Sequence, residues 1–117
     1  GIPAKFPKLR WCFVEVSAQW IPYALNDLSI RFRRRGEEMS ESIMADNNIW
    51  VACQVTDDID YVLKYAGETQ LVVGTDYGHN DTSTEIEAIR KLSSDGKVSP
   101  EVAGKILDDN ARKLYGL

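Results

Sequence analysis

The stretch IWVACQVTDDIDYVLKYAGETQLVVG, residues 49–74, contains a complete strand–helix–strand pattern. Both of its ends are short apolar runs rich in β-branched residues, which is typical of buried strands. Between them, Asp57 or Asp58 is expected to cap a helix. That helix is predicted to bury an apolar stripe and to end at a glycine: Ile59, Val62, Leu63, Ala66 and then Gly67. Two apolar strands joined by an amphipathic helix indicate a parallel sheet.

The same alternation continues on both sides of this stretch. Upstream, LRWCFVEV (Leu9–Val16) is predicted to be a buried strand, and Pro22 is expected in the first turn of the next helix. Downstream, one helix is predicted at 83–92 and a last one after Ser99, whose side chain is a suitable cap. The order is strand, helix, strand, helix, strand, helix, helix. It predicts an α/β fold with a parallel sheet covered on both faces.

A sheet of three strands has two open edges. Edges of this kind would be long, flat and hydrophobic, and they tend to pair with strands of other chains. We therefore expect residues 1–117 to be a single α/β segment that lacks neighbouring strands of a larger fold.

Charge and hydropathy exclude several classes of protein. The net charge of −4 and the pI near 4.9 argue against a general nucleic-acid or anionic-membrane binder. The arginines at 31 and 33–35 are interpreted as a solvated helix end, where cations suit the helix dipole. No apolar run approaches the ~18 residues that span a bilayer, and a cytoplasmic location is expected. Cys12 and Cys53 lie within apolar strands and are interpreted as buried free thiols.

The candidate site follows from where the strands end. Reactive residues of parallel α/β folds stand at the carboxyl ends of strands, and these positions hold Glu15, Asp76 and, shortly after, His79. Asp76 is either a ligand for a divalent metal or a residue that braces its own loop. Glu15 has either a structural partner or a catalytic role, and His79 is the single histidine. A catalytic zinc site needs about three protein ligands, which Asp76 and His79 do not supply.

Three segments together carry a resemblance to a known family. One is the apolar strand that runs into GTDY at 74–77, with His79 close behind. Another is the closing helix KILDDNARKLYG at 105–116. The third combines FPKLRW at 6–11 with Glu15 and WIPY at 20–23. In this order the segments resemble the amidohydrolase-related family, the group that contains aminocarboxymuconate-semialdehyde decarboxylase and related metal-dependent hydrolases.

The resemblance implies a (β/α)8 TIM barrel, of which this chain would supply strands six to eight and the C-terminal helix. Members of the family bind one metal, commonly zinc or manganese, through an HxH, a histidine on the fifth strand and an aspartate on the eighth. Asp76 matches that aspartate, which implies a metal-binding and catalytic role. The resemblance places His79, Glu15 and Trp20 near the substrate. Many relatives carry a histidine on the strand that holds Glu15, so this chain departs from the family there.

The function implied is that of the C-terminal portion of a metal-dependent hydrolase or decarboxylase of a small carboxylic or cyclic substrate. Because the HxH and the fifth-strand histidine are missing, we expect the isolated chain to be inactive and to bind no metal tightly. The alternative is a non-catalytic α/β module that self-associates, or docks on a partner, through its open sheet edges. An enzyme based on either cysteine is disfavoured, since both lie inside strands and not at strand ends.

Overall fold

Three parallel strands form the sheet in a computed structural model that describes residues 1–80, 87–94, 96 and 98–117. The strands are β1 (Trp11–Phe13), β2 (Ile49–Cys53) and β3 (Leu71–Val73), and they pair in the order β1-β2-β3. Cys12 lies opposite Trp50, and Ala52 lies opposite Val72. The predicted α/β class and the parallel arrangement are confirmed.

Helices connect and flank the strands. In chain order they are α1 (Ile2–Lys5), α2 (Ile21–Arg34), α3 (Ile43–Asp46), α4 (Ile59–Ala66), α5 (Ala88–Ser94), α6 (Pro100–Gly104), a π-helical turn (Lys105–Asp109) and α7 (Asn110–Tyr115). The short α1 was not predicted. The helix predicted at 83–92 begins, as far as the chain is described, at Ala88 and runs on to Ser94, and the expected start at 83 lies outside the described residues. Among the described residues, no helix is both long and apolar enough to cross a membrane.

The helix ends follow the capping rules that the sequence suggested. Asp58, and not Asp57, caps α4: its carboxylate accepts a hydrogen bond from the Tyr61 backbone N–H. Gly67 follows with φ of 71°, a left-handed value that glycine adopts without steric cost. Ser99 caps α6 by accepting from the Val102 N–H, with Pro100 in the first turn.

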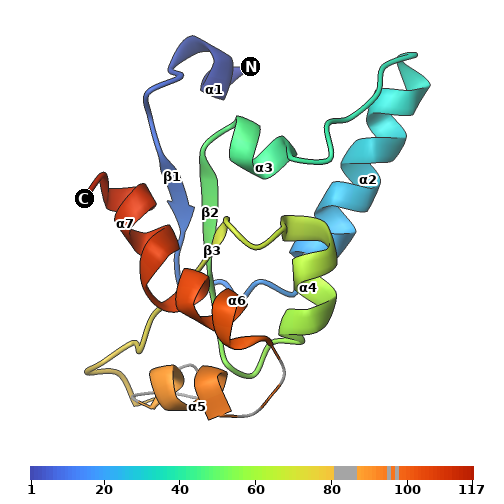
Figure 1. The fold of residues 1–117 in the computed structure, drawn as a ribbon. Helices are drawn as coiled ribbons and strands as arrows, with labels where there is room; N and C mark the ends of the chain where they lie inside the picture. Colours follow the sequence, from blue (N-terminus) through green and yellow to red (C-terminus); the bar gives the residue numbers. More distant parts are fainter. Residues whose placement is uncertain (81–86, 95, 97) are drawn as a thin grey trace.

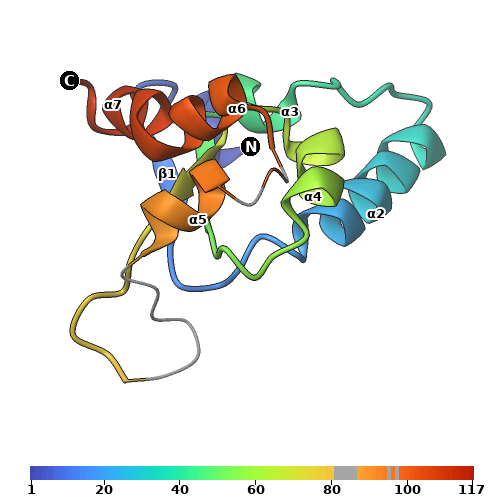
Figure 2. The same ribbon diagram turned by 60° about the horizontal axis from the view of Figure 1, so that its bottom comes forward.

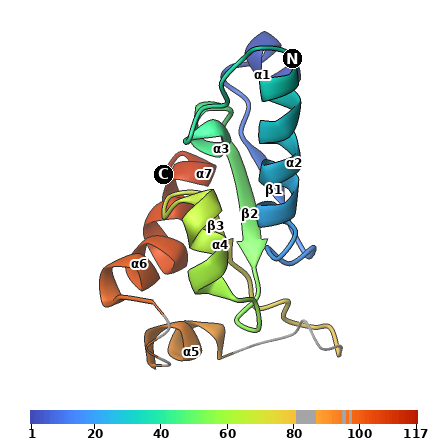
Figure 3. The same ribbon diagram turned by 90° about the vertical axis from the view of Figure 1, so that its right-hand side faces the viewer.

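The two faces of the sheet are covered unequally. One face carries the main core, in which Val51, Cys53 and Leu71 pack with Ile21 of α2 and Val62 of α4. The other face carries a small cluster in which Trp50, Val72 and Leu114 are buried. In Figure 1, α2 and α4 lie on the right of the strands, and the C-terminal helix crosses beside β3 to end on the left. Figure 3 shows α4 between α6 and α2. The sheet was predicted to be covered on both faces. Helices cover one face completely and the other only in part.

The C-terminal helix is anchored to β3 through Asn110. Its side chain is fully buried, and Nδ2 donates hydrogen bonds to the backbone oxygens of Glu68 (2.9 Å) and Leu71 (2.8 Å). The π-helical turn directly before Asn110 has hydrogen bonds that span one residue more than those of an α-helix, which shifts the following side chains around the helix axis. The sequence predicted the helix but neither its π-helical turn nor this buried amide.

Candidate functional site

The polar ends of the three strands meet at one edge of the sheet. Because the strands are parallel, their carboxyl ends point the same way, toward the bottom of Figure 1, and Figure 2 turns that end toward the viewer. A cavity of about 320 Å³ opens there. Its lining includes residues of all three strands or their ends, and of α7: Cys12, Val14, Glu15, Ala52, Cys53, Gln54, Val72, Val73, Gly74, Asp76, Ala111, Leu114 and Tyr115.

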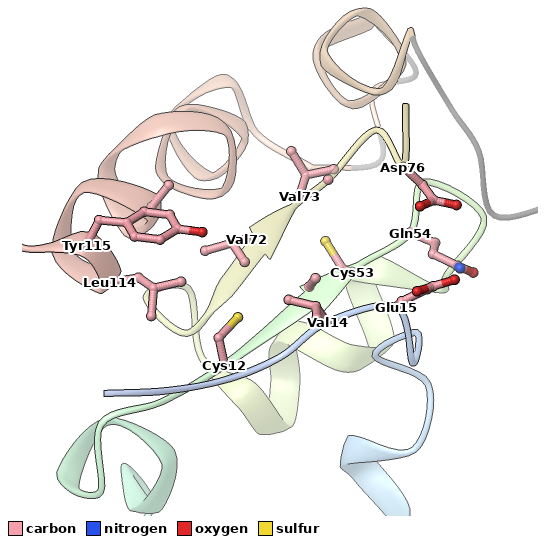
Figure 4. Close-up of a pocket in the computed structure, with 13 residues that line it drawn as sticks. Cys12, Val14, Glu15, Cys53, Gln54, Val72, Val73, Asp76, Leu114 and Tyr115 are labelled. Atoms are coloured by element: carbon pink, nitrogen blue, oxygen red, sulfur yellow. The ribbon is translucent and has the colours of Figure 1, made fainter. Parts of the chain in front are cut away.

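The cavity has a polar end and an apolar end. Figure 4 shows the side chains of Glu15, Gln54 and Asp76 on one side, and those of Leu114 and Tyr115 of α7 on the opposite side. Small-molecule sites commonly combine an apolar lining with a few converging polar groups, at volumes of roughly 300–1,000 Å³. The dimensions and the chemistry of this cavity suit a small organic molecule with a polar group directed at Glu15 and Asp76.

Asp76, His79 and Glu15 lie together at the polar end. His79 Nδ1 is 3.1 Å from Asp76 Oδ1, 3.2 Å from Asp76 Oδ2 and 3.7 Å from Glu15 Oε1. One ligand atom from each residue lies within 4.8 Å of the other two. The structure thus brings together three of the four residues that the sequence analysis selected.

The backbone at two of these residues takes an unusual conformation. Glu15 has φ of 58° and Asp76 has φ of 51°, and Ser17, two residues after Glu15, has φ of 57°. Left-handed values are uncommon for residues other than glycine, and they occur often at functional sites, where the surrounding structure enforces them. The His79 N–H donates to the Asp76 carbonyl (3.2 Å), which closes the turn between the two residues.

A buried aspartate holds the loop that carries Glu15. Asp57 is 4% exposed, and its carboxylate accepts hydrogen bonds from Ser17 Oγ, from the Ala18 N–H (2.9 Å) and from the Gln54 N–H (2.9 Å). It therefore ties the loop after β1 to the loop after β2. From the sequence, Asp57 was predicted only as a possible helix cap. The signal that could have identified it is the Asp57-Asp58 pair after a strand, because a helix needs one capping carboxylate and the second is left for another role.

Trp20 does not line the cavity. Its Nε1 donates to the Ser17 carbonyl (2.9 Å), and its ring meets Phe13 edge-on at a centroid distance of 5.6 Å. Both contacts brace the loop between β1 and α2. Its role in substrate binding stays a prediction.

The two cysteines are free, and both line the cavity. Burial raises the pKa of the Cys53 thiol to about 12, and the Asp57 carboxylate adds to this effect. Burial also raises the pKa of Cys12. Cys12 was predicted to be buried, but it is only half-buried. Thiols with raised pKa values are poor nucleophiles at neutral pH, which disfavours a cysteine-based reaction.

The donor set fits a divalent metal. One imidazole nitrogen and two carboxylates are ligand types found at zinc sites, and carboxylates also suit manganese. Asp76 and His79 were the candidate ligands predicted from the sequence, and Glu15 lies close enough to both to be a third. Three protein ligands with open positions for water or substrate are the usual composition of a catalytic zinc site.

Comparisons with known proteins agree with this architecture. The class that the fold defines is a three-stranded α/β segment that matches part of an amidohydrolase TIM barrel. One matching crystal structure is that of an amidohydrolase from Mycobacterium avium subsp. paratuberculosis K-10, with a TM-score of 0.79 at 21% sequence identity. The match covers 100% of this chain and 30% of that one, so the chain spans less than a third of the length of the solved protein. No family profile and no curated protein matches the sequence.

Proposed function

We propose that this chain is the C-terminal portion of a metal-dependent amidohydrolase-related enzyme, and that Asp76 is its metal-binding aspartate. The observation that carries the proposal is the position of Asp76 at the carboxyl end of β3, beside His79 Nδ1 at 3.1 Å, in a fold that matches part of an amidohydrolase barrel. Reactive groups of such barrels stand at this end of the strands.

In the complete enzyme, Asp76 would hold the metal, and Glu15 and His79 would lie near the substrate. A divalent metal at this position supplies Lewis-acid polarisation of a substrate oxygen and lowers the pKa of a water molecule. The apolar part of the cavity, with Val14, Ala52 and Val72, would hold the body of a small carboxylic or cyclic substrate. Zinc or manganese is the expected metal, and hydrolysis or decarboxylation is the expected reaction.

The isolated chain is proposed to be inactive. The resemblance requires an HxH and a further histidine as ligands, and the sequence contains His79 alone. In addition, the sheet has two edges in the described residues, whereas a closed barrel has none. Self-association or docking through the free edge of β1 is the second candidate function, favoured by the exposed apolar side chains of Phe13, Val14 and Val16.

The coding sequence upstream of residue 1 tests the proposal most directly. We expect it to encode an HxH-bearing strand and a further histidine-bearing strand in the same reading frame. The longer protein should bind zinc or manganese and act on members of a panel of small carboxylic acids and cyclic amides.

In that longer protein, Asp76→Asn should lose both the bound metal and the activity. The control is Asp58→Asn, which should keep both because asparagine also caps helices. An Asp76→Asn protein that retains metal and turnover would contradict the proposal.

A further inference from the structure

We infer that Glu15, Asp76 and His79 form a divalent-metal site that this chain assembles by itself, with all three side chains as ligands. The inference deepens the proposed metal site and rests on the proposed function only for the choice of Asp76. It adds Glu15 and His79, which the resemblance places near the substrate, as direct ligands.

The three contacts converge on one atom. Both oxygens of the Asp76 carboxylate and Glu15 Oε1 lie 3.1–3.7 Å from the same imidazole nitrogen, His79 Nδ1. Two carboxylates this close repel each other unless positive charge lies between them. A divalent ion bound by Nδ1 and both carboxylates provides that charge, and the two negative charges neutralise the ion.

Glu15 follows β1, whereas Asp76 and His79 follow β3, and contacts within the chain hold both loops in place. Asp57 ties the loop of Glu15 to the end of β2, through Ser17, Ala18 and Gln54. The backbone hydrogen bond from His79 to Asp76 fixes the spacing of the other two ligands. A site whose supporting contacts are formed before the ion arrives loses less entropy on binding.

Solvent can reach the site. The side chains of His79 and Glu15 are 59% and 55% exposed, and that of Asp76 is 24% exposed. An ion can therefore enter from water and keep water molecules on its open coordination positions, as catalytic zinc sites do. The exposure also predicts weaker binding than in a complete barrel, where further ligands and burial would add to the affinity.

The imidazole sets the metal preference. Nitrogen ligands favour zinc and cobalt over magnesium, which prefers oxygen ligands and retains much of its water. The chain should therefore select Zn²⁺ over Mg²⁺, and this selectivity should depend on His79.

Titration of the metal-free 117-residue chain tests the inference. Calorimetry with Zn²⁺ should show one ion per chain, and Co²⁺ should give visible absorption bands of a nitrogen–oxygen site. Glu15→Gln, Asp76→Asn and His79→Gln should each weaken Zn²⁺ binding by at least ~10-fold, the loss seen even when outer contacts of metal ligands are removed. His79→Gln should also abolish the preference for Zn²⁺ over Mg²⁺.

Glu41→Gln is the matched control, since this exposed carboxylate lies in the connection before α3, and its affinity for Zn²⁺ should be unchanged. Circular dichroism confirms that each variant is folded, which is expected because the substitutions conserve shape at exposed or half-buried side chains. Asn in place of Asp76 also tolerates the left-handed backbone.

Absence of stoichiometric Zn²⁺ binding would overturn the inference, and so would an unchanged affinity in Glu15→Gln.

Different outcomes would contradict the inference and the proposed function. If the chain binds no Zn²⁺ but a longer protein binds it through Asp76, the inference is wrong and the proposed function stands. If the chain binds Zn²⁺ through all three residues and no HxH-bearing strand is encoded upstream, the inference stands and the proposed function is wrong.

Discussion

The two faces of the sheet differ in what covers them. On the packed face, Val51 and Leu71 are fully buried against helices of the same chain, together with Ile106 of the π-helical turn. On the cavity face, the buried hydrophobic cluster in the described chain consists of Trp50, Val72 and Leu114, and Ala52 and Val72 there line the 320 Å³ cavity. One face is completed by the chain's own helices, and the other is only partly covered by α7.

This asymmetry is what a segment of a barrel would show. In a barrel the helices cover the outer face of the sheet, while the inner face packs against strands on the far side. An open sheet with helices on both faces would bury its two faces about equally. Under the proposed function, the cavity and the free edge of β1 are the surfaces on which the further strands of the barrel would pack.

The largest effect is expected from matched leucine substitutions on the two faces of the sheet. Leu71→Ala on the packed face should lower the free energy of unfolding by about 3–5 kcal/mol, because close packing leaves the cavity unfilled. Leu114→Ala on the cavity face should cost roughly 2 kcal/mol or less, since this site can relax into the open space. Urea denaturation of both variants measures the difference. Equal losses would mean that the two faces are equally packed.

The pH dependence of stability should be dominated on the packed face by Cys53. Its pKa is raised to about 12 from 9.0, so the folded state holds the thiol proton more tightly than the unfolded chain. Its contribution to stability is complete below pH 9 and is lost as pH rises toward 12. At pH 10 the stability lost relative to neutral pH amounts to about 1.4 kcal/mol.

Comparison with Cys53→Ala isolates the thiol from other groups that titrate at alkaline pH. Denaturation at pH 7 and pH 10 should show a smaller loss of stability in Cys53→Ala than in the unsubstituted chain. An identical loss in both proteins would show that Cys53 is not responsible.

The smallest effect on stability is expected at the exposed end of β1. Val14 is 63% exposed, so Val14→Lys should change the free energy of unfolding by at most about 0.5 kcal/mol. If the edge drives self-association, the lysine should nevertheless reduce it, because charges on edge strands block pairing. Sedimentation velocity measures the share of dimer. Tyr23→Lys on α2, where the side chain is 77% exposed, is the control and should leave that share unchanged.

Local signals accounted for most of the fold. The apolar runs and caps predicted the strand–helix alternation because capping and burial act over a few residues, as at Asp58 and Ser99. The strands were predicted too long. Leu9–Val16 shrinks to Trp11–Phe13, because a strand extends only as far as its ladder with β2 and the chain turns at Glu15 into a left-handed conformation. Hydrophobic residues continue through this turn to Val16, so no strand boundary could be predicted there.

The members of the site were predictable, but their proximity was not. Glu15, Asp76 and His79 follow from the rule that strand ends carry chemistry. Their convergence on His79 Nδ1 depends on backbone angles and on the Asp57 contacts, which link residues about 40 positions apart. Such long-range contacts leave no local pattern. The unequal covering of the two faces was likewise hidden, because β2 is apolar on both of its sides.

The left-handed backbone at Glu15 sets a conflict between stability and function. Glycine adopts φ of 58° without the steric cost, roughly 1 kcal/mol or more, that a residue with a Cβ carries there. Glu15→Gly should therefore be the more stable chain, and it would lack the carboxylate that faces His79. If Glu15 has the proposed role, the substitution that relieves the backbone also removes the carboxylate that the site needs.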